Sequence, residues 1–254
     1  MVNISIITVT YNAANTLQRT LDSVGKQACR SFEHLIIDGK SSDETIEMAT
    51  RYKKDNPDVN ITILSERDKG LYDAMNKGLK MASGQFVCFL NAGDKLHSEN
   101  SLTAINNIIE DGLQKGSVPA VVYGETDIVD DEGNFISHRR LKAPEELTWK
   151  SFKMGMLVCH QSFYANKDVV GDYDLTYRFS ADFDWCVRAM KTAKEKQMPL
   201  VNCHQILTDY LSEGMTTQNH KASLKERFRI MKKHYGWLTT VCCHAWFFVR
   251  AIFK

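Results

Sequence analysis

The feature that most constrains the fold is a regular alternation of strand-like and helix-like segments through the first part of the chain. Ile4 to Thr10 is rich in β-branched residues, and a stretch with Leu17, Leu21 and Val24 at helical spacing follows it. The pattern recurs, with strands expected at 4–10, 34–37, 61–64 and 86–90 and helices at 15–27, 44–54 and 71–81. Strands that alternate with helices form parallel sheets. The sequence therefore predicts an α/β fold with a doubly wound, mostly parallel sheet flanked by helices.

The second half of the chain continues this pattern less regularly. Strands are expected at 118–123 and 163–165, and a helix with several charged residues at 179–193. No internal repeat, low-complexity segment or linker-like stretch interrupts the order. We therefore expect this half to elaborate the same domain.

Charge and cysteine content narrow the class of protein. The 32 Lys+Arg and 31 Asp+Glu leave a formal net charge of +1, which provides no overall field to hold a nucleic acid. The seven cysteines include no CxxC pair, and most lie in apolar runs, as reduced core cysteines do. The N-terminal segment has neither a basic leader nor a small-residue cleavage site. We expect a cytoplasmic protein without a nucleic-acid partner.

Polar side chains follow three of the predicted strands. Tyr11-Asn12 follows the first strand, Asp38 the second, and Asn91 to Asp94 the fourth. In open α/β sheets, ligands bind beyond the carboxyl ends of the strands, so these loops should meet at one crevice. An aromatic ring can stack on a base, and carboxylates can accept from a ribose or bind a cation that bridges phosphates. Although single aspartates after strands are often only turn residues, the three loops together favour a nucleoside diphosphate.

Glycine-rich phosphate loops are missing from the sequence. No GxGxxG follows the first strand, and no GxxxxGK[ST] occurs. A cation is therefore expected to carry the phosphate charge. A sugar nucleotidyltransferase would share the crevice, but it would need a glycine-rich, basic N-terminal loop, and Thr10 to Ala14 is neither.

Five motifs occur in order along the chain: SIITVTYN, IIDGKSSDET, DKGLYDAMNKGLKMASG, FLNAGD and SADFDWCVRA. In this order and spacing they resemble family 2 glycosyltransferases of the GT-A fold, over roughly Ile4 to Ala189. The resemblance implies transfer of a sugar from a nucleotide-sugar donor with inversion at the anomeric carbon, helped by Mg²⁺ or Mn²⁺. DAMNKG together with NAGD looks most like the branch that builds bacterial surface polysaccharides.

On the donor side, the resemblance assigns Val9 and Tyr11 to the nucleoside and Asp38 to the region that faces the base and ribose. Asp94 matches the metal motif, with Asn91 as a neutral neighbour in the donor site. Many relatives carry two adjacent acids where this chain reads Asp38-Gly39, and Asp-x-Asp-Asp where it reads Asn91-Ala92-Gly93-Asp94. One aspartate is sufficient in principle, because Mg²⁺ keeps several waters and also binds substrate phosphates.

The catalytic base is expected in the SADFDW segment. The resemblance matches Asp182 to the carboxylate that removes the acceptor hydroxyl proton as that oxygen attacks the sugar. It places Arg188, six positions later, on the acceptor side. Asp184 points about 200° away from Asp182 on a helix, so it is either a second acceptor contact or, as we favour, a solvated or structural residue.

Further candidates lie outside these segments. Asp68 precedes a helix whose N-terminus could direct N–H groups toward the donor, so Asp68 is expected to contact the donor. In that helix, Asn76 is as readily a packing residue as a ligand, and Lys77 is expected to be solvated. His160 is placed near the acceptor, although a lone histidine is more often structural. His220 is a further candidate metal ligand from a C-terminal loop.

The end of the chain has a different composition. Residues 216–254 combine the basic stretch KERFRIMKKH with a mostly apolar one that is too short and interrupted for a spanning helix. We expect a catalytic domain over 1–215, with a nucleotide-sugar half at about 1–98 and an acceptor half at about 99–215, and then an amphipathic helical extension. The extension is interpreted as a peripheral contact with the inner face of the cell membrane, with a buried helix or an oligomer contact as alternatives.

The sequence thus predicts a non-processive glycosyltransferase with a saccharide acceptor, favoured to be lipid-linked. Processive relatives carry a Gln-x-x-Arg-Trp motif and several spanning helices, and this sequence has neither. A membrane-associated scaffold that keeps the fold but has lost catalysis is the alternative, motivated by the thinned acidic motifs. The motifs do not fix the nucleotide, the sugar, the acceptor or the oligomeric state.

Overall fold

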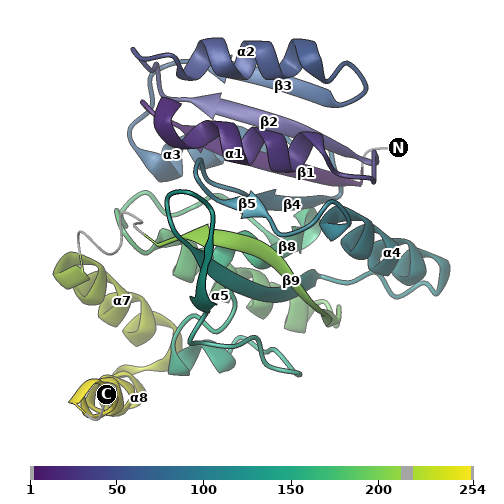
Figure 1. Cartoon of the computed structure of the whole chain (residues 1–254). Coiled ribbons are helices and arrows are strands. Elements are labelled where there is room, and N and C mark those ends of the chain that lie inside the picture. The colour runs from purple at the N-terminus through teal and green to yellow at the C-terminus, as the bar shows by residue number, and fades with distance from the viewer. Residues whose placement is uncertain (1–2, 213–219, 253–254) are drawn as a thin grey trace.

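The computed structural model describes residues 3–212 and 220–252 and is built on a nine-stranded sheet (Figure 1). The strand order is β3-β2-β1-β4-β8-β6-β9-β5, with β7 beside β6. The strands are β1 (Ile4–Thr10), β2 (Phe32–Asp38), β3 (Asn60–Ser65), β4 (Phe86–Phe89), β5 (Lys95–Leu96), β6 (Val121–Val129), β7 (Phe135–His138), β8 (Phe163–Asn166) and β9 (Leu200–Leu211). The α-helices are α1 (Ala14–Gly25), α2 (Thr45–Asp55), α3 (Leu71–Met81), α4 (Ser101–Gln114), α5 (Ala181–Glu195), α7 (His220–Tyr235) and α8 (Trp237–Ile252).

The N-terminal half of the sheet is wholly parallel, as the sequence predicts. β1 pairs with β2 on one side and with β4 on the other, and β2 pairs with β3, all in parallel. Every residue of β1 and β2 is buried, which suits the apolar and β-branched residues that dominate β1 and the Leu35–Ile37 run of β2. Since the chain crosses from one side of β1 to the other between β3 and β4, the carboxyl ends of β1 and β4 border a topological switch point.

Two apolar cores cover the two faces of the sheet. Successive residues of a strand point to opposite faces, so Ile7 and Val9 of β1 join one core and Ile4 and Ile6 join the other. The core of Ile7 and Val9 includes buried residues of α3 and α5, and the other core includes those of α1, α2 and α4. In Figure 1, α1 lies in front of the sheet while α3 and α5 lie behind it.

The second half of the sheet is mixed. β8 is antiparallel to both β4 and β6, whereas β9 runs parallel to β6 and antiparallel to the short β5. β6 and α5 confirm a strand and a helix that the sequence predicts, with β6 running further than expected. The sequence analysis assigned no element to α4 or to the long β9.

α7 packs beside α5, and α8 packs on α7, at the end of the molecule opposite α2 and β3 (Figure 1). Glu226 of α7 accepts the backbone N–H groups of Arg178, Phe179 and Ser180 at 2.8–3.1 Å, just before α5 begins. This carboxylate thereby satisfies N–H groups at the start of α5, as a capping residue does. Within residues 3–212 and 220–252, no helix is both long and apolar enough to cross a membrane.

Gly78 is the point of closest approach between α3 and the sheet. A Cβ placed there would overlap the Ile7 side chain and lie 3.2 Å from Cγ1 of Ile37. We expect Gly78→Ala to lower the free energy of unfolding by about 1–3 kcal/mol through overpacking. Urea titration would measure this, with an unchanged m value. Gly171→Ala is the control, because its nearest neighbour lies 3.9 Å away; equal effects of both variants would contradict the packing argument.

Candidate active site

A cavity of about 1080 Å³ opens at the carboxyl ends of β1 and β4. Its wall comes from β1, the loop after β4, α3, β6, β9, α5 and α7, so both halves of the chain contribute. Seven of the predicted site residues line it: Val9, Tyr11, Asp68, Asn91, Asp94, His160 and Asp182. Asp38, Asp184 and Arg188 do not line this cavity. The side chain of His220 lies outside the described part of the structure, so its predicted role stays a prediction.

One end of the cavity is bordered by the loop after β1. Tyr11 is 68% exposed there, with its ring accessible from the cavity, and Val9 forms part of the buried wall. The Asn12 N–H donates to Ser41 Oγ at 2.8 Å, and Asn12 Oδ1 accepts from the Ser42 N–H at 2.9 Å. These hydrogen bonds join the loop after β1 to the loop after β2. The rim that carries Tyr11 is therefore made of two loops that are hydrogen-bonded to each other.

Asp38 lies behind this rim and not in the cavity. Its carboxylate is fully buried and accepts the N–H groups of Lys40 and Ser41, both at 3.0 Å. Three hydroxyls also donate to it, those of Thr10, Ser41 and Ser65. Burial acts to raise the pKa of Asp38, but these hydrogen bonds outweigh it and hold the pKa below its usual value. Asp38 therefore fixes the turn whose residues Gly39 and Lys40 reach the cavity.

Two glycines stand where relatives often carry acids, and both are closely packed. A Cβ at Gly39 would overlap the Asp68 carboxylate and lie 3.3 Å from the Tyr11 ring. Gly93 has φ +103°, and a Cβ there would lie 2.9 Å from Leu211 Cδ2. Asp68 itself lines the cavity and accepts the Gly70 N–H at 2.8 Å, ahead of α3. The positive φ of Gly93 thus favours glycine at that position, whereas at Gly39 a Cβ would require the Asp68 side chain to move.

Asp94 is the buried carboxylate of the cavity. It is 4% exposed; its Oδ1 accepts the Leu211 N–H at 3.0 Å and its Oδ2 accepts Gln161 Nε2 at 2.7 Å. Burial raises the pKa of Asp94 to about 7, although both hydrogen bonds act to lower it. A carboxylate desolvated to this degree binds a proton or a cation readily.

Asn91, three residues earlier in the same loop, supplies a second side-chain oxygen. Its side-chain Oδ1 is buried and has no hydrogen-bond partner among the described residues, and both Asn91 and Asp94 line the cavity. A buried acceptor without a donor is unfavourable by about 1–3 kcal/mol. Carboxylate and amide oxygens are the ligands of hard cations such as Mg²⁺ and Mn²⁺. The residues present therefore fit a divalent cation that keeps open positions for other ligands.

A second group of potential metal ligands comprises His97, Asp127 and Asp209, whose ligand atoms lie within 4.8 Å of one another. Ile128 and Tyr210, the next residues along β6 and β9, line the cavity. Because neighbours on a strand point to opposite faces, the group faces away from the cavity. Asp209 already accepts Lys95 Nζ at 3.1 Å and His97 Nδ1 at 2.6 Å, so the group is a satisfied ion-pair network.

Asp182 projects into the cavity from the first turn of α5. The Tyr72 hydroxyl of α3 donates to its Oδ1 at 3.3 Å. Burial of Tyr72, with the field of Asp182 adding to it, raises the pKa of the phenol well above its usual value. Tyr72 is therefore a neutral donor at neutral pH, and it orients a carboxylate that is otherwise open to the cavity.

His160 lies in the wall of the cavity. It is 4% exposed, its ring stacks on Phe89 with centroids 5.3 Å apart, and its Nε2 lies 2.6 Å from the Tyr173 hydroxyl. Burial lowers the pKa of His160, with the field of Asp182 opposing the shift. The imidazole is therefore neutral near pH 7, and an acceptor contact by His160 stays a prediction.

Asp184 is not solvated, and that part of the sequence interpretation is wrong. It is fully buried and binds Arg188 Nε at 2.6 Å, His234 Nε2 at 2.8 Å and Lys233 Nζ at 3.2 Å. These partners outweigh the effect of burial and lower the pKa of Asp184. Asp184 thus joins α5 to α7. We also interpreted Asp184 as a structural residue, and this network agrees with that role better than with an acceptor contact.

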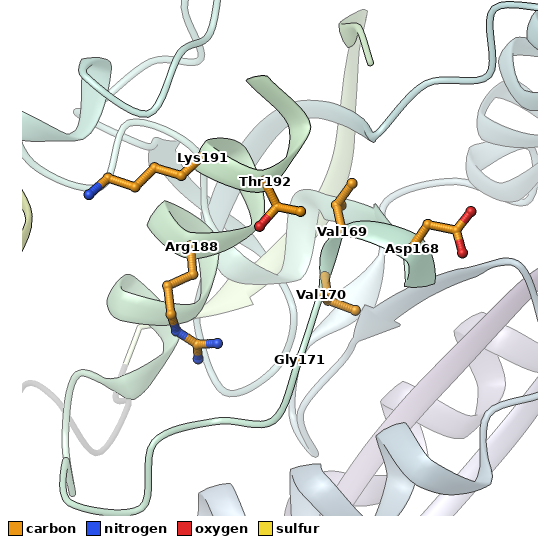
Figure 2. Close-up of a pocket in the computed structure, with 7 residues that line it drawn as sticks. All are labelled: Asp168, Val169, Val170, Gly171, Arg188, Lys191 and Thr192. Atoms are coloured by element: carbon orange, nitrogen blue, oxygen red, sulfur yellow. The ribbon is translucent and has the colours of Figure 1, made fainter. Parts of the chain in front are cut away.

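Arg188 faces a separate, smaller cavity of about 310 Å³. Figure 2 shows the residues around it, with Arg188, Lys191 and Thr192 on one side and residues 168–171 on the other. Besides Asp184, the Arg188 guanidinium donates to the Asp172 carbonyl at 2.8 Å. The structure therefore does not bring Arg188 to Asp182.

The predicted helix residues Asn76 and Lys77 have structural contacts. Asn76 Nδ2 donates to the Tyr173 carbonyl at 3.1 Å, and Asn76 Oδ1 accepts the Tyr173 N–H at 2.7 Å. Lys77 Nζ pairs with Glu66 at 2.9 Å and donates to the Arg67 carbonyl at 2.7 Å. Asn76 is a packing residue, and Lys77 holds the loop that precedes α3.

Several lining residues were missed by the sequence analysis, namely Tyr72, Arg139, Gln161, Tyr210 and Arg227. Tyr72 lies inside the motif DKGLYDAMNKGLKMASG and Gln161 follows the candidate His160, so their neighbours could have indicated them. Arg227 belongs to the basic stretch that was interpreted as a membrane contact. The sequence offers no local signal that separates this arginine from the lysines around it.

The description "Glycosyl transferase family 2" belongs to a family model that matches residues 5–172. A "PGL/p-HBAD biosynthesis glycosyltransferase" of Mycobacterium bovis is 34% identical over 187 residues, which cover 72% of this chain and 68% of the relative. "Amylovoran biosynthesis glycosyltransferase AmsB" of Erwinia amylovora is 27% identical over 217 residues, covering 81% of this chain and 70% of the relative.

Among solved structures, S. aureus TarS 1-349 in complex with UDP-GlcNAc superposes with a TM-score of 0.68 at 18% identity. The superposition covers 91% of this chain but 64% of the TarS chain, so this chain spans less than two thirds of that structure. At this identity the similarity concerns the fold, which is that of GT-A enzymes.

Proposed function

The chain belongs to glycosyl transferase family 2, and we propose that it is an inverting, non-processive enzyme that moves one sugar from a nucleotide-sugar donor to a saccharide acceptor. One observation carries the proposal: Tyr11, the Asn91–Asp94 oxygen pair and Asp182 line a single cavity, although they come from distant parts of the chain. An aromatic ring, hard oxygen ligands and an accessible carboxylate are the groups that this reaction requires.

On the donor side, Tyr11 would stack on the base while Val9 borders it and Asp68 accepts hydrogen bonds from the ribose or the sugar. Asp38 would act through the turn that it fixes beneath the nucleoside. Asp94 and Asn91 would hold Mg²⁺ or Mn²⁺, which when bound neutralises charge on the departing diphosphate. The lack of a glycine-rich phosphate loop supports this use of a cation.

On the acceptor side, Asp182 would accept the proton of the attacking hydroxyl. The bond between the anomeric carbon and the diphosphate oxygen breaks as the acceptor oxygen attacks from the opposite face, which inverts the configuration. The hydrogen bond from Tyr72 orients the Asp182 carboxylate, and the neutral ring of His160 lines the same part of the wall without competing for the proton.

A scaffold that has lost catalysis is less consistent with this cavity. The cavity keeps Asp94 with a pKa raised to about 7 and Asn91 Oδ1 without a partner among the described residues, and both reduce stability. Unfavourable groups of this kind are retained where a ligand uses them. The glycine at 93 has a positive φ that favours this residue, so its presence there has a structural reason.

The names of the relatives support a place in bacterial glycan assembly, and the exposed surface of α7 and α8 supports a lipid-linked acceptor. One relative is named for PGL/p-HBAD and another for amylovoran biosynthesis. In this chain, α8 exposes Trp237, Leu238, Trp246 and Phe248 by 51–74% of their surfaces, and α7 carries exposed lysines and arginines. Aromatic and basic groups together suit an anionic membrane surface. We propose peripheral attachment at the inner face of the membrane.

Replacing the base tests the reaction. We expect Asp182→Asn to lower turnover of the accepted nucleotide sugar by about 10²–10⁴-fold, because the amide cannot take the proton. Donor affinity, measured by calorimetry, should stay within about twofold, since Asp182 acts on the acceptor. Asp172→Asn, which alters an exposed carboxylate of the same strand-to-helix segment, is the control. Full turnover by Asp182→Asn would show that another group is the base.

The cation is tested by its pH dependence. Asp94 must lose its proton to bind Mn²⁺, so affinity should be constant above its pKa of about 7 and fall up to about tenfold per pH unit below it. Calorimetric titration with Mn²⁺ and nucleoside diphosphate at pH 6, 7 and 8 measures this. Asp94→Asn should bind at least about tenfold more weakly at pH 8. Asp111→Asn, on an exposed face of α4, is the control; pH-independent binding would exclude Asp94 as a ligand.

Membrane attachment is tested with vesicles. The protein should co-sediment with phosphatidylcholine vesicles that contain phosphatidylglycerol, and less with phosphatidylcholine alone. The double variant Trp246→Ala/Phe248→Ala should lose most of this binding, because both side chains are exposed on α8. Leu113→Ala, an exposed apolar residue of α4, is the matched control. Binding that is equal in all three proteins would place the contact elsewhere.

A further inference from the structure

Arg227 is a cation of the cavity that the proposed reaction leaves without a role. It comes from α7, lines the same cavity as Asp182, and its Nε is buried without a hydrogen-bond partner among the described residues. The Arg227 guanidinium forms no ion pair with any residue in 3–212 or 220–252. Burying an uncompensated charge is unfavourable. An arginine in this state is therefore expected to meet an anionic group that residues 3–212 and 220–252 do not supply.

The position of Arg227 is fixed by its surroundings. Its guanidinium carbon lies 5.2 Å from the centre of the Phe183 ring, which is in α5 beside Asp182. The neighbouring Glu226 binds the N–H groups at the start of α5, and the other end of α7 is tied to α5 through Asp184 and His234. Contacts before and after Arg227 in α7 thus hold the helix against the segment that carries the base.

Arg227 and Asp182 line the same cavity, and Arg227 contacts Phe183, the residue that follows Asp182. Burial lowers the pKa of Arg227, the field of Asp182 opposes that shift, and the field of Arg139 adds to it. Arg139 also lines the cavity, but its guanidinium N–H groups already donate to the carbonyls of Leu141, Met156 and Leu157. Arg139 therefore contributes mainly charge, whereas Arg227 keeps N–H donors for a ligand.

The chemistry then decides which ligand group Arg227 meets. In an inverting displacement, the base and the leaving group lie on opposite faces of the sugar ring. A cation beside the base is consequently on the acceptor side, away from the diphosphate that departs. This step rests on the proposed function, because it takes Asp182 as the base.

We propose that Arg227 binds an anionic group of the acceptor, a phosphoryl or a carboxylate group, and so selects acidic acceptors. A guanidinium can donate two parallel hydrogen bonds to either group. The subsite would hold the acid group of the acceptor while the attacking hydroxyl lies at Asp182. On this view α7 is part of the substrate site and not only a link to the membrane.

The test measures acceptor-side binding with the donor site filled. Wild-type protein saturated with Mn²⁺ and with UDP or GDP, whichever binds, is titrated with farnesyl diphosphate, farnesol, glucuronate and glucose. We expect the acidic probe that matches the acceptor to bind at least tenfold more tightly than its neutral counterpart, and Arg227→Met to abolish that difference. The two acidic probes separate a phosphoryl from a carboxylate group.

Matched variants keep the result interpretable. Arg229→Met changes an exposed arginine of the same helix and should retain the preference. Arg227→Lys keeps the charge but loses the paired donors, so it should bind the acidic probe at least threefold more weakly, and it serves if Arg227→Met does not fold. Nucleoside diphosphate affinity should be equal in wild type and in both Arg227 variants.

Three results would overturn the inference. Equal binding of an acidic probe to wild type and to both Arg227 variants would remove the subsite, as would equal binding of acidic and neutral probes to wild type. Loss of nucleoside diphosphate affinity in Arg227→Met would move Arg227 to the leaving-group side. Failure of wild type to bind any nucleoside diphosphate would instead contradict the proposed function itself.

Discussion

The parallel pairing of β1 with both β2 and β4 is the constraint on which the rest of the structure depends. Because all seven residues of β1 are buried, its two faces must be covered by helices, and the chain must cross the sheet to supply them. The same pairing sets the carboxyl ends of β1, β2 and β4 at one edge. The loops after β1 and β4 therefore border one cavity, whatever residues they contain.

The second half of the chain turns this edge into an enclosed site. Gln161 and Leu211, which come from segments around β8 and β9, bind the two oxygens of Asp94. These contacts hold the carboxylate in place while burial raises its pKa, so it is oriented without being neutralised by an internal cation. Asp38 shows the opposite arrangement, since five hydrogen bonds stabilise its charge and leave it no capacity for a ligand. Two aspartates at neighbouring strand ends thus differ in role because their partners differ.

The sequence predicted the fold where the signal is local. β1, α1, β2, α2, β3, α3 and β4 follow from apolar periodicity, and the cavity follows from strand-end geometry. α4 was missed although Leu102, Ile105 and Ile109 have helical spacing, whereas β9 pairs with β6 through register shifts that no periodicity reveals. Asp184 was correctly placed on the helix face away from Asp182. Its buried environment could not be predicted, because His234 lies fifty residues further along the chain.

The contacts of α7 with distant segments change the interpretation of the C-terminal end of the chain. Composition alone sets the basic and apolar stretch apart as an appendage, yet Glu226 satisfies the N–H groups that begin α5, and Asp184 needs partners from α7 to be buried as a charge. Removal of α7 would leave both sets of groups unsatisfied next to Asp182. The exposed aromatic residues of α8 directly follow this helix. The surface of α8 for which membrane attachment is proposed is therefore joined through α7 to the segment that carries Asp182, and α7 also contributes Arg227 to the cavity.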